Sequence, residues 1–380
     1  MGTTPTHVAD LAAAMDRALT LAARGPAHGP NPRVGCVLLA PQRPGDVARR
    51  VIGEGWHRGA GTDHAEVAAL ADARERGNDP RAATAVVTLE PCDHTGRTGP
   101  CARALLDAAV AEVVYALDDP GQASGGGAQT LRAHGVLVSG GLRAAASLDL
   151  VRAWRHALRA ARPYVTLKLA TTLDGRVAAP DGTSRWITGP AARAHAHAVR
   201  ATVDAIAVTT GTALADDPAL TARTPDGALA GHQPLRVVVG HRDLPPGARL
   251  HGPGGQVVRL RTHDAATVLA ALHEREVRHL LVEGGPALAT ALLAAGVVDE
   301  VHAYLAPVLL GAGPSAVAPF GVTTLSGAPR WRTVSVQRLG DDALLVARAE
   351  PTEPVDPTEP AHVSEPAHPT DPAHTTGKEH

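Results

Sequence analysis

Apolar and polar positions in the first third of the chain are spaced so that helices and strands alternate. Residues 8–24 carry apolar side chains at helical spacing among good helix formers, and the Gly- and Pro-rich stretch after them ends this helix. Short apolar runs at 34–40 and 49–57 are joined by a turn-rich segment and predict a β-hairpin. Further helices are expected at 64–77, 101–110 and up to 136, and further strands at 83–92 and 112–120. This alternation predicts a layered α/β sheet.

A second series of strands and helices begins at Pro163, after a helical, basic stretch at 147–162 that is typical of a connector. Helices are expected near 190–202 and 264–276 and a closing strand near 343–349, and the other segments of this second α/β unit are 164–175, 204–220, 235–240, 256–260, 279–296 and 299–311. The expected division of the chain is a first domain at 1–147, a linker at 148–162, a second domain at 163–350 and a tail at 351–380.

The last thirty residues differ in composition from the rest of the chain. Pro, Glu, Asp, Thr and His dominate them, and such a segment cannot bury a core, so we expect disorder. His362, His368, His374 and His380 recur at a fixed interval. A weak metal-scavenging role is conceivable for them, but the composition favours a solvated tail.

Composition and charge narrow the class of protein. A length of 380 residues favours two domains, and 44% hydrophobic with 19% charged residues is typical of a folded chain. The net charge of −2 argues against a nucleic-acid or anionic-membrane partner. The N-terminal residues do not resemble a signal peptide, no run approaches the ~20 apolar residues of a membrane span, and three cysteines do not suit a disulfide framework. We therefore expect a cytoplasmic protein with reduced thiols.

A candidate metal site combines one histidine with two cysteines. His64 and Glu66 open a predicted helix, Cys92 follows a predicted strand, and Cys101 begins the next helix. One imidazole and two thiolates are three zinc ligands, and a three-ligand set leaves a fourth position for water, as in catalytic sites. Zinc lowers the pKa of that water toward ~7, and an unbound carboxylate such as Glu66 can carry its proton to a leaving amine.

The spacing of these residues can be compared with a known signature. H-x-E together with P-C-x-x-C is typical of zinc nucleobase deaminases, but here eight residues separate Cys92 from Cys101. Taken alone, the triplet at His64 would indicate only an incidental surface histidine. Its combination with a cysteine at a strand end in the same α/β unit favours zinc. Cys36 lies in a predicted strand and is interpreted as a small buried hydrophobe.

Three loops are expected to converge on the same site. Asn31 precedes a strand, and its amide can both donate to and accept from a pyrimidine edge. His57 follows the next strand, and Arg97 lies between the two cysteines, where a guanidinium would suit a phosphate. Each of these, taken singly, is as compatible with an ordinary turn or a solvated side chain.

The second unit carries a weaker signal for a nucleotide. The VEGGP stretch at 282–286 predicts a strand, a glycine turn and a helix start, where free N–H groups favour a phosphate. It is not a G-x-G-x-x-G motif, and taken alone it is better explained as an ordinary strand–helix turn. Lys168 lies in a predicted strand, where a buried lysine without a partner would be unfavourable, although a partly exposed edge lysine is the alternative.

Taken together, NPRVGCVLL, GEGWHRGAGTDHAE, VTLEPCDHTGRTGPC, TLKLATTLDGR, SRWITG, TGTALADDPALTAR and VEGGP closely resemble, in order, the bifunctional riboflavin-biosynthesis deaminase–reductases. The wide cysteine spacing is that family's own. The resemblance implies a cytidine-deaminase-like first domain and a dihydrofolate-reductase-like second domain. The chain differs from the family's pattern at Asp93, at Gly99 and at Gly121-Gln122, so the resemblance does not fix the details of the first pocket.

The resemblance also implies the two reactions. The first domain would use zinc to deaminate 2,5-diamino-6-(5-phosphoribosylamino)pyrimidin-4(3H)-one, and the second would use NADPH to reduce the ribosyl to the ribityl chain. By this likeness His64, Cys92 and Cys101 bind zinc and Glu66 shuttles the proton. The residues implied at NADPH are Ala170, Trp186, Thr212, Asp216 and Gly285. Those implied at the substrate are Asn31, His57, Arg97, Lys168, Ser184, Arg200, Leu220, Arg223 and Glu283. A homo-oligomer formed through the second domain is a further implication.

Two rival interpretations remain at this stage. A nucleic-acid deaminase fused to an unrelated reductase predicts a basic groove and the short cysteine spacing, and neither is present in the sequence. A binding module with a structural zinc clip leaves Glu66 and the open fourth position unexplained. The assay that separates them is ammonia release and NADPH oxidation with the diaminopyrimidine ribotide.

Overall fold

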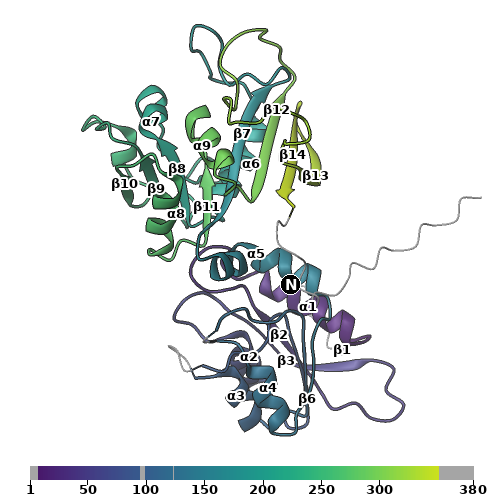
Figure 1. Cartoon of the computed structure of the whole chain (residues 1–380). Coiled ribbons are helices and arrows are strands. Elements are labelled where there is room, and N and C mark those ends of the chain that lie inside the picture. Colours follow the sequence, from purple (N-terminus) through teal and green to yellow (C-terminus); the bar gives the residue numbers. More distant parts are fainter. Residues whose placement is uncertain (1–6, 95–98, 123, 351–380) are drawn as a thin grey trace, which may run out of the picture. The chain divides into compact units, whose positions relative to one another are not determined.

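The structure of the chain is a computed structural model that describes residues 7–94, 99–122 and 124–350 (Figure 1). The tail at 351–380 and Arg97 lie outside these residues, so the structure does not test the predictions made for them. Among the described helices, none is both long enough and apolar enough to cross a bilayer.

The N-terminal residues form a six-stranded sheet in the order β1-β3-β2-β4-β5-β6. The expected hairpin is confirmed, since β2 and β3 pair antiparallel, and β4, β5 and β6 run parallel to one another. The strands are β1 (His7–Val8), β2 (Gly35–Leu39), β3 (Arg49–Trp56), β4 (Thr84–Val87), β5 (Glu112–Tyr115) and β6 (Leu137–Ser139). Here β1 and β6 were not expected, because strands of two and three residues carry no periodic signal.

Helices cover both faces of this sheet, which makes a three-layer α/β/α unit. Helix α1 (Leu11–Ala22) packs on one face, and α2 (Ala65–Glu75), α3 (Cys101–Asp107) and α4 (Gly127–Ala133) pack on the other. Gly55 in β3 allows α2 to lie close to the sheet, because a Cβ there would stand 2.3 Å from the carbonyl oxygen of Ala65. This close packing fixes the start of α2, which carries His64 and Glu66.

The expected connector is a helix, α5 (Ala144–Ala160), that begins three residues earlier than its sequence suggested. Its first turns are anchored to the N-terminal sheet, because the buried Ser147 hydroxyl donates to the carbonyl oxygen of Thr88 at 2.5 Å. The chain then enters the second sheet at β7.

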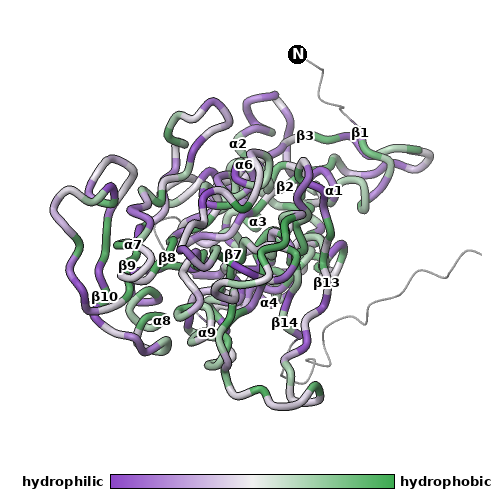
Figure 2. The backbone as a smooth tube through the Cα atoms, turned by 90° about the horizontal axis from the view of Figure 1, so that it is seen from above, coloured by the Kyte–Doolittle hydropathy of each residue, from purple (hydrophilic) through white to green (hydrophobic). Residues whose placement is uncertain are grey.

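The second sheet has eight strands in the order β10-β9-β8-β11-β7-β12-β14-β13. The first six of these run parallel, and β14 and β13 add an antiparallel hairpin at one edge. The strands are β7 (Tyr164–Thr172), β8 (Ala205–Thr209), β9 (Leu235–Val239), β10 (Val257–Leu260), β11 (His279–Val282), β12 (Glu300–Ala306), β13 (Trp331–Leu339) and β14 (Asp342–Ala349). Hydrophobic residues lie mainly in the buried strands, and hydrophilic residues lie mainly in the connecting loops (Figure 2).

The helices of this half are α6 (Pro190–Arg200), α7 (Thr210–Asp216), α8 (Ala265–His273) and α9 (Pro286–Ala294), with a short 3₁₀ turn at Arg249–His251. Because β8, β11 and β7 are parallel neighbours, their carboxyl ends meet at one edge of the sheet. The chain places polar residues there: Thr209 ends β8 and Glu283 follows β11. This edge positions the second of the two sites.

Candidate active sites

Three metal-ligand side chains converge between α2 and α3. His64 is the residue before α2, Cys101 is the first residue of α3, and Cys92 lies in the loop after β4. His64 Nδ1 lies 3.2 Å from Cys101 Sγ and 3.5 Å from Cys92 Sγ, and the three potential ligand atoms are all within 4.8 Å of one another. This arrangement fits a small divalent cation held by one nitrogen and two sulfurs.

The electrostatics of the two sulfurs favour a thiolate at this position. Hydrogen bonding from the Cys101 thiol, with a further contribution from His64, lowers the pKa of Cys92 to about 4. The same contact with Cys92 raises the pKa of Cys101 above its ordinary range. The backbone N–H of Cys101 also points at Cys92 Sγ, 3.4 Å away. One sulfur is therefore favoured as a thiolate beside a second sulfur and an imidazole, and sulfur and imidazole donors suit zinc.

Glu66 lies in the first turn of α2 and is almost completely buried, with 3% of its surface exposed. Burial, reinforced by the negative charge of Cys92, raises the pKa of Glu66 to about 7. A carboxyl group with a pKa near the working pH can both take up and release a proton during a reaction. Glu66 thus has the properties of a proton carrier beside the three ligands.

His64, Glu66 and Cys92 line a cavity of about 560 Å³, and two of the predicted pocket residues, Asn31 and His57, line it as well. The Asn31 amide nitrogen donates to His57 Nε2 at 3.0 Å, and His57 Nδ1 lies 3.2 Å from the carbonyl oxygen of Asp63. The His57 ring packs edge-on against His64, with 5.4 Å between ring centroids. Asn31 therefore contacts His57, and His57 contacts His64.

The cavity also contains residues that the sequence did not single out, namely His94, Asp119 and Trp154. Asp119 accepts a hydrogen bond from the backbone of Gly121 at 2.8 Å, which shapes the loop where the chain departs from its family. Asp93 is not in the cavity lining, and its carboxylate accepts from the Thr130 hydroxyl at 2.6 Å. The departure at Asp93 is therefore accommodated outside the pocket.

A second cavity of about 1180 Å³ lies at the carboxyl edge of the C-terminal sheet. It collects all of the residues that the resemblance implied for the second domain, although they come from one strand, two helices and several loops. They are Lys168, Ala170, Ser184, Trp186, Arg200, Thr212, Asp216, Leu220, Arg223, Glu283 and Gly285. Further lining residues, not singled out from the sequence, include His197 and Tyr304.

A buried ion cluster occupies one wall of this cavity. Arg200 donates two hydrogen bonds to the carboxylate of Glu283, at 2.6 and 2.8 Å, and Lys168 Nζ lies 3.7 Å from Glu283 Oε2. Burial by itself would raise the pKa of Glu283, but the positive charges of Arg200 and Lys168 outweigh it and lower the pKa to about 2. Lys168 lies on an interior strand and not at a sheet edge, but 23% of its side chain is exposed, so it is partly exposed as the alternative interpretation expected.

The glycine turn before α9, at Gly284 and Gly285, contacts α7. The backbone N–H of Gly285 donates to the Thr212 hydroxyl at 3.0 Å, and a Cβ at Gly284 would stand 2.9 Å from the side chain of Leu288. Trp186 lies at the rim of the cavity with 70% of its surface exposed, and the Arg193 guanidinium lies 4.7 Å from its ring. A flat, exposed aromatic and a glycine turn thus face the same cavity.

Comparisons with known proteins identify both halves. The family model described as the cytidine and deoxycytidylate deaminase zinc-binding region matches residues 9–117, and the model described as the RibD C-terminal domain matches residues 163–345. Together with the two cavities, these matches define the class as a zinc-dependent deaminase joined to a reductase. The chain belongs to the RibD family of bifunctional riboflavin-biosynthesis enzymes.

The relatives extend over most of the chain. The riboflavin biosynthesis protein RibD of Mycobacterium tuberculosis (strain H37Rv) is 48% identical over 317 residues, which cover 83% of this chain and 90% of that protein. RibD of Escherichia coli (strain K12) is 38% identical over 367 residues, covering 87% and 97%. The crystal structure of a Thermotoga maritima diaminohydroxyphosphoribosylaminopyrimidine deaminase/5-amino-6-(5-phosphoribosylamino)uracil reductase matches with a TM-score of 0.79 at 31% identity, covering 89% of this chain and 98% of that one. Acinetobacter baumannii RibD, form 1, matches with a TM-score of 0.78 at 35% identity, covering 90% and 99%.

These matches confirm the predicted fold class, the family and the two cofactors, zinc and NADPH. The roles of the individual residues stay predictions. The candidate zinc ligands could be selected from the sequence because their residue types and order are distinctive. Tyr304 and His94 could not, because a tyrosine in a strand and a histidine in a loop carry no signal of their own.

Proposed function

We propose that the first cavity deaminates 2,5-diamino-6-(5-phosphoribosylamino)pyrimidin-4(3H)-one and that the second reduces the product to 5-amino-6-(5-phosphoribitylamino)uracil. The observation that carries the first half is the cluster of His64, Cys92 and Cys101 ligand atoms within 4.8 Å, with the buried Glu66 beside it. The second half is supported by the Arg200–Glu283–Lys168 cluster in a cavity that also contains a glycine turn. The Thermotoga maritima relative is named for the same pair of reactions.

In the deamination, His64, Cys92 and Cys101 would hold zinc, which when bound makes a water nucleophilic near neutral pH. Glu66 takes the proton of the attacking water and delivers it to the leaving amino nitrogen, so that one water and one amine become a carbonyl and ammonia. The Asn31 amide nitrogen is held by His57, and its oxygen makes no hydrogen bond among the described residues. That oxygen is available to accept from the pyrimidine edge.

In the reduction, bound NADPH would supply the hydride for C1′ of the ring-opened ribosylamine, whose C1′=N double bond becomes a single bond as the nitrogen takes up a proton. The chain's own part is to orient the two reactants and to balance charge. Gly285 and the turn after it would contact the cofactor phosphates, and Ala170, Trp186, Thr212 and Asp216 would lie along the cofactor in the same cavity. The residues proposed to hold the phosphoribosyl substrate are Lys168, Ser184, Arg200, Leu220, Arg223 and Glu283.

The proposed division of labour follows the two cavities. Residues 1–147 would form the deaminase domain and 163–350 the reductase domain, with 148–162 between them. We infer a small-molecule substrate, a cytoplasmic location and no nucleic-acid partner, consistent with a net charge of −2. Assembly into a homo-oligomer through the reductase domain belongs to the same proposal. It is tested by sedimentation of the full chain beside a chain that ends before residue 148.

Removing zinc should separate the two activities. Treatment with a chelator is expected to reduce ammonia release to background, because Glu66 alone has no activated water to deprotonate. NADPH oxidation with the pre-deaminated substrate should stay unchanged, and added zinc should restore ammonia release. Cys92→Ala should lose the metal, measured by elemental analysis, whereas the matched control Cys36→Ala should keep it, because Cys36 is buried in the core of β2. A chelated enzyme that still releases ammonia would contradict the zinc mechanism.

Arg223→Ala should impair the reductase alone. The Arg223 guanidinium lies in the second cavity and is steadied by the carbonyl oxygen of Gly227 at 2.7 Å, which leaves its other N–H groups for the substrate phosphate. Loss of a charged hydrogen bond should raise the reductase KM by roughly tenfold or more, with ammonia release unchanged. Arg338→Ala is the control, since Arg338 is 82% exposed on β13 and outside the cavity. An unchanged KM in Arg223→Ala would remove this residue from the site.

A further inference from the structure

Tyr304 is a buried residue of the reductase cavity that the proposed reaction does not yet use. It lies on β12, is 1% exposed and contributes to the cavity lining. In the parallel pairing of β12 with β7, Tyr304 is opposite Ala170, and Lys168 lies two residues earlier on β7. Because alternate residues of a strand share a face, Tyr304, Ala170 and Lys168 project from the same side of the sheet.

The ring of Tyr304 is the second partner of the Lys168 ammonium group. Lys168 Nζ lies 5.8 Å from the ring centroid, which is within the range of a cation–π interaction. Its other partner, Glu283, is 3.7 Å away, too far for a direct hydrogen bond. The ammonium is therefore held in place by charge and by the aromatic face while its N–H groups remain available to a ligand in the cavity.

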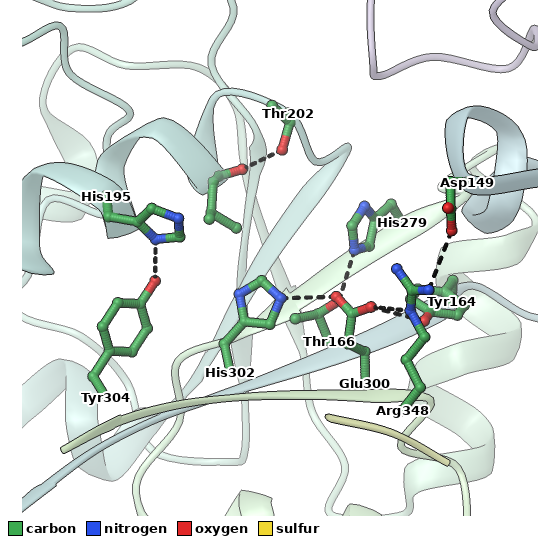
Figure 3. A network of polar contacts seen from close by, with 11 residues as sticks. Asp149, Tyr164, Thr166, His195, Thr202, His279, Glu300, His302, Tyr304 and Arg348 are labelled. Carbon is green, nitrogen blue, oxygen red and sulfur yellow. Dashed lines mark hydrogen bonds and ion pairs between the residues drawn. The ribbon is translucent and has the colours of Figure 1, made fainter. Parts of the chain in front are cut away.

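The orientation of the ring is fixed from the neighbouring helix. The Tyr304 hydroxyl lies 2.8 Å from Nδ1 of His195 on α6, the helix that also carries Arg200 (Figure 3). Burial raises the pKa of Tyr304 above its ordinary range and lowers the pKa of His195, so a protonated phenol donates to a neutral imidazole. The ring thus has one anchor on the sheet and one on α6.

We propose that Tyr304, anchored by His195, is a positioning residue of the reductase that holds the Lys168 ammonium where it can donate hydrogen bonds to the ribosyl oxygens beside C1′. The inference rests on the proposed reduction and adds a residue outside the set implied by the family resemblance. A purely structural tyrosine would need only to fill the core. Here the phenol oxygen is bound away from the cavity by His195, and it is the ring that contacts the reactive cluster.

The test is a double-mutant cycle between Tyr304 and Lys168 in the full chain, read out as reductase kcat and KM with the pre-deaminated substrate. Tyr304→Leu is expected to lower kcat by roughly tenfold, in line with the strength of a partly buried cation–π pair. In a Lys168→Met background the same substitution should have no further effect, because the group it positions is gone. Tyr304→Phe keeps the ring but loses the hydrogen bond to His195, so its kcat should lie between those of the wild type and Tyr304→Leu. A fluorinated phenylalanine in place of Tyr304, which keeps the shape but weakens the negative ring face, should behave like Tyr304→Leu.

A matched control separates positioning from loss of a buried tyrosine. Tyr164→Leu removes a tyrosine that is 6% exposed on the same strand as Lys168 but outside the cavity lining, and it should lower the melting temperature without changing kcat. Direct titration of NADPH should give the same Kd for wild type and Tyr304→Leu. Additive losses in Tyr304→Leu and Lys168→Met would overturn the inference and leave the proposed reduction standing. An unaffected Lys168→Met enzyme would overturn both the inference and the proposed role of Lys168.

Discussion

Glu66→Gln is expected to lower the rate of ammonia release by about 10²- to 10⁴-fold, the usual contribution of a positioned general acid–base group. Glutamine has nearly the same shape as glutamate but cannot carry a proton from the attacking water to the leaving amine. Glu66 is buried beside the metal-ligand cluster without belonging to it, so the substitution should leave His64, Cys92 and Cys101 in place. The zinc content should therefore remain that of the wild type.

Three measurements on one preparation test this expectation: zinc by elemental analysis, ammonia release, and NADPH oxidation with the pre-deaminated substrate. Glu54→Gln is the matched control, because Glu54 is a largely buried glutamate of the same half that pairs with Arg17 outside the cavity. It should lower stability with little effect on ammonia release. A Glu66→Gln protein that retains wild-type ammonia release would exclude Glu66 as the proton carrier. Loss of both activities would show instead that the two halves are not independent.

The interior strands of both sheets could be predicted from the sequence, but several edge strands could not. The interior strands β4 and β8 are short, continuous apolar runs, and such runs are visible in a sequence. Strand β13 was missed because most of its residues are exposed on both faces, so it has no clean alternation of apolar and polar positions. The turn at Gly340 that joins it to β14 is a local signal, but the edge that β14 offers for pairing is a tertiary feature.

The two sites differ in how far the sequence could predict them. Zinc ligands are recognisable because few residue types bind the metal, and the order His64, Cys92, Cys101 is informative in itself. In the reductase cavity, the resemblance supplied the residues, but their mutual contacts depend on strand order. Lys168 meets Tyr304 because β7 and β12 are neighbours in a fixed register, and it meets Glu283 because β11 lies on the other side. A single sequence does not contain that register.

The second prediction with a large effect concerns the free energy of unfolding that the Arg200–Glu283 pair contributes. Glu283→Ala should lower the free energy of unfolding by about 3–5 kcal/mol, because it leaves the buried Arg200 guanidinium without its carboxylate. Reductase activity should be lost with it, since both side chains line the cavity. The double variant Arg200→Met/Glu283→Leu should recover part of the stability but none of the activity, because an apolar pair removes the uncompensated charge. Asp341→Asn is the control. Asp341 pairs with Arg338 and is 89% exposed, so its substitution should lower the free energy of unfolding by less than about 1 kcal/mol.

The same pair predicts the sign of a pH effect. The pKa of Glu283 is lowered from 4.5 to about 2 in the folded protein, so its ionised form stabilises the fold. This contribution, on the order of 3 kcal/mol, is fully present above pH 4.5 and is lost as the pH falls toward 2. Chemical denaturation of the wild type and of Glu283→Gln should therefore give a difference in unfolding free energy that is constant near neutral pH and shrinks below pH 4.5. A difference that stays constant down to pH 2 would mean that Glu283 is not held ionised by Arg200 and Lys168.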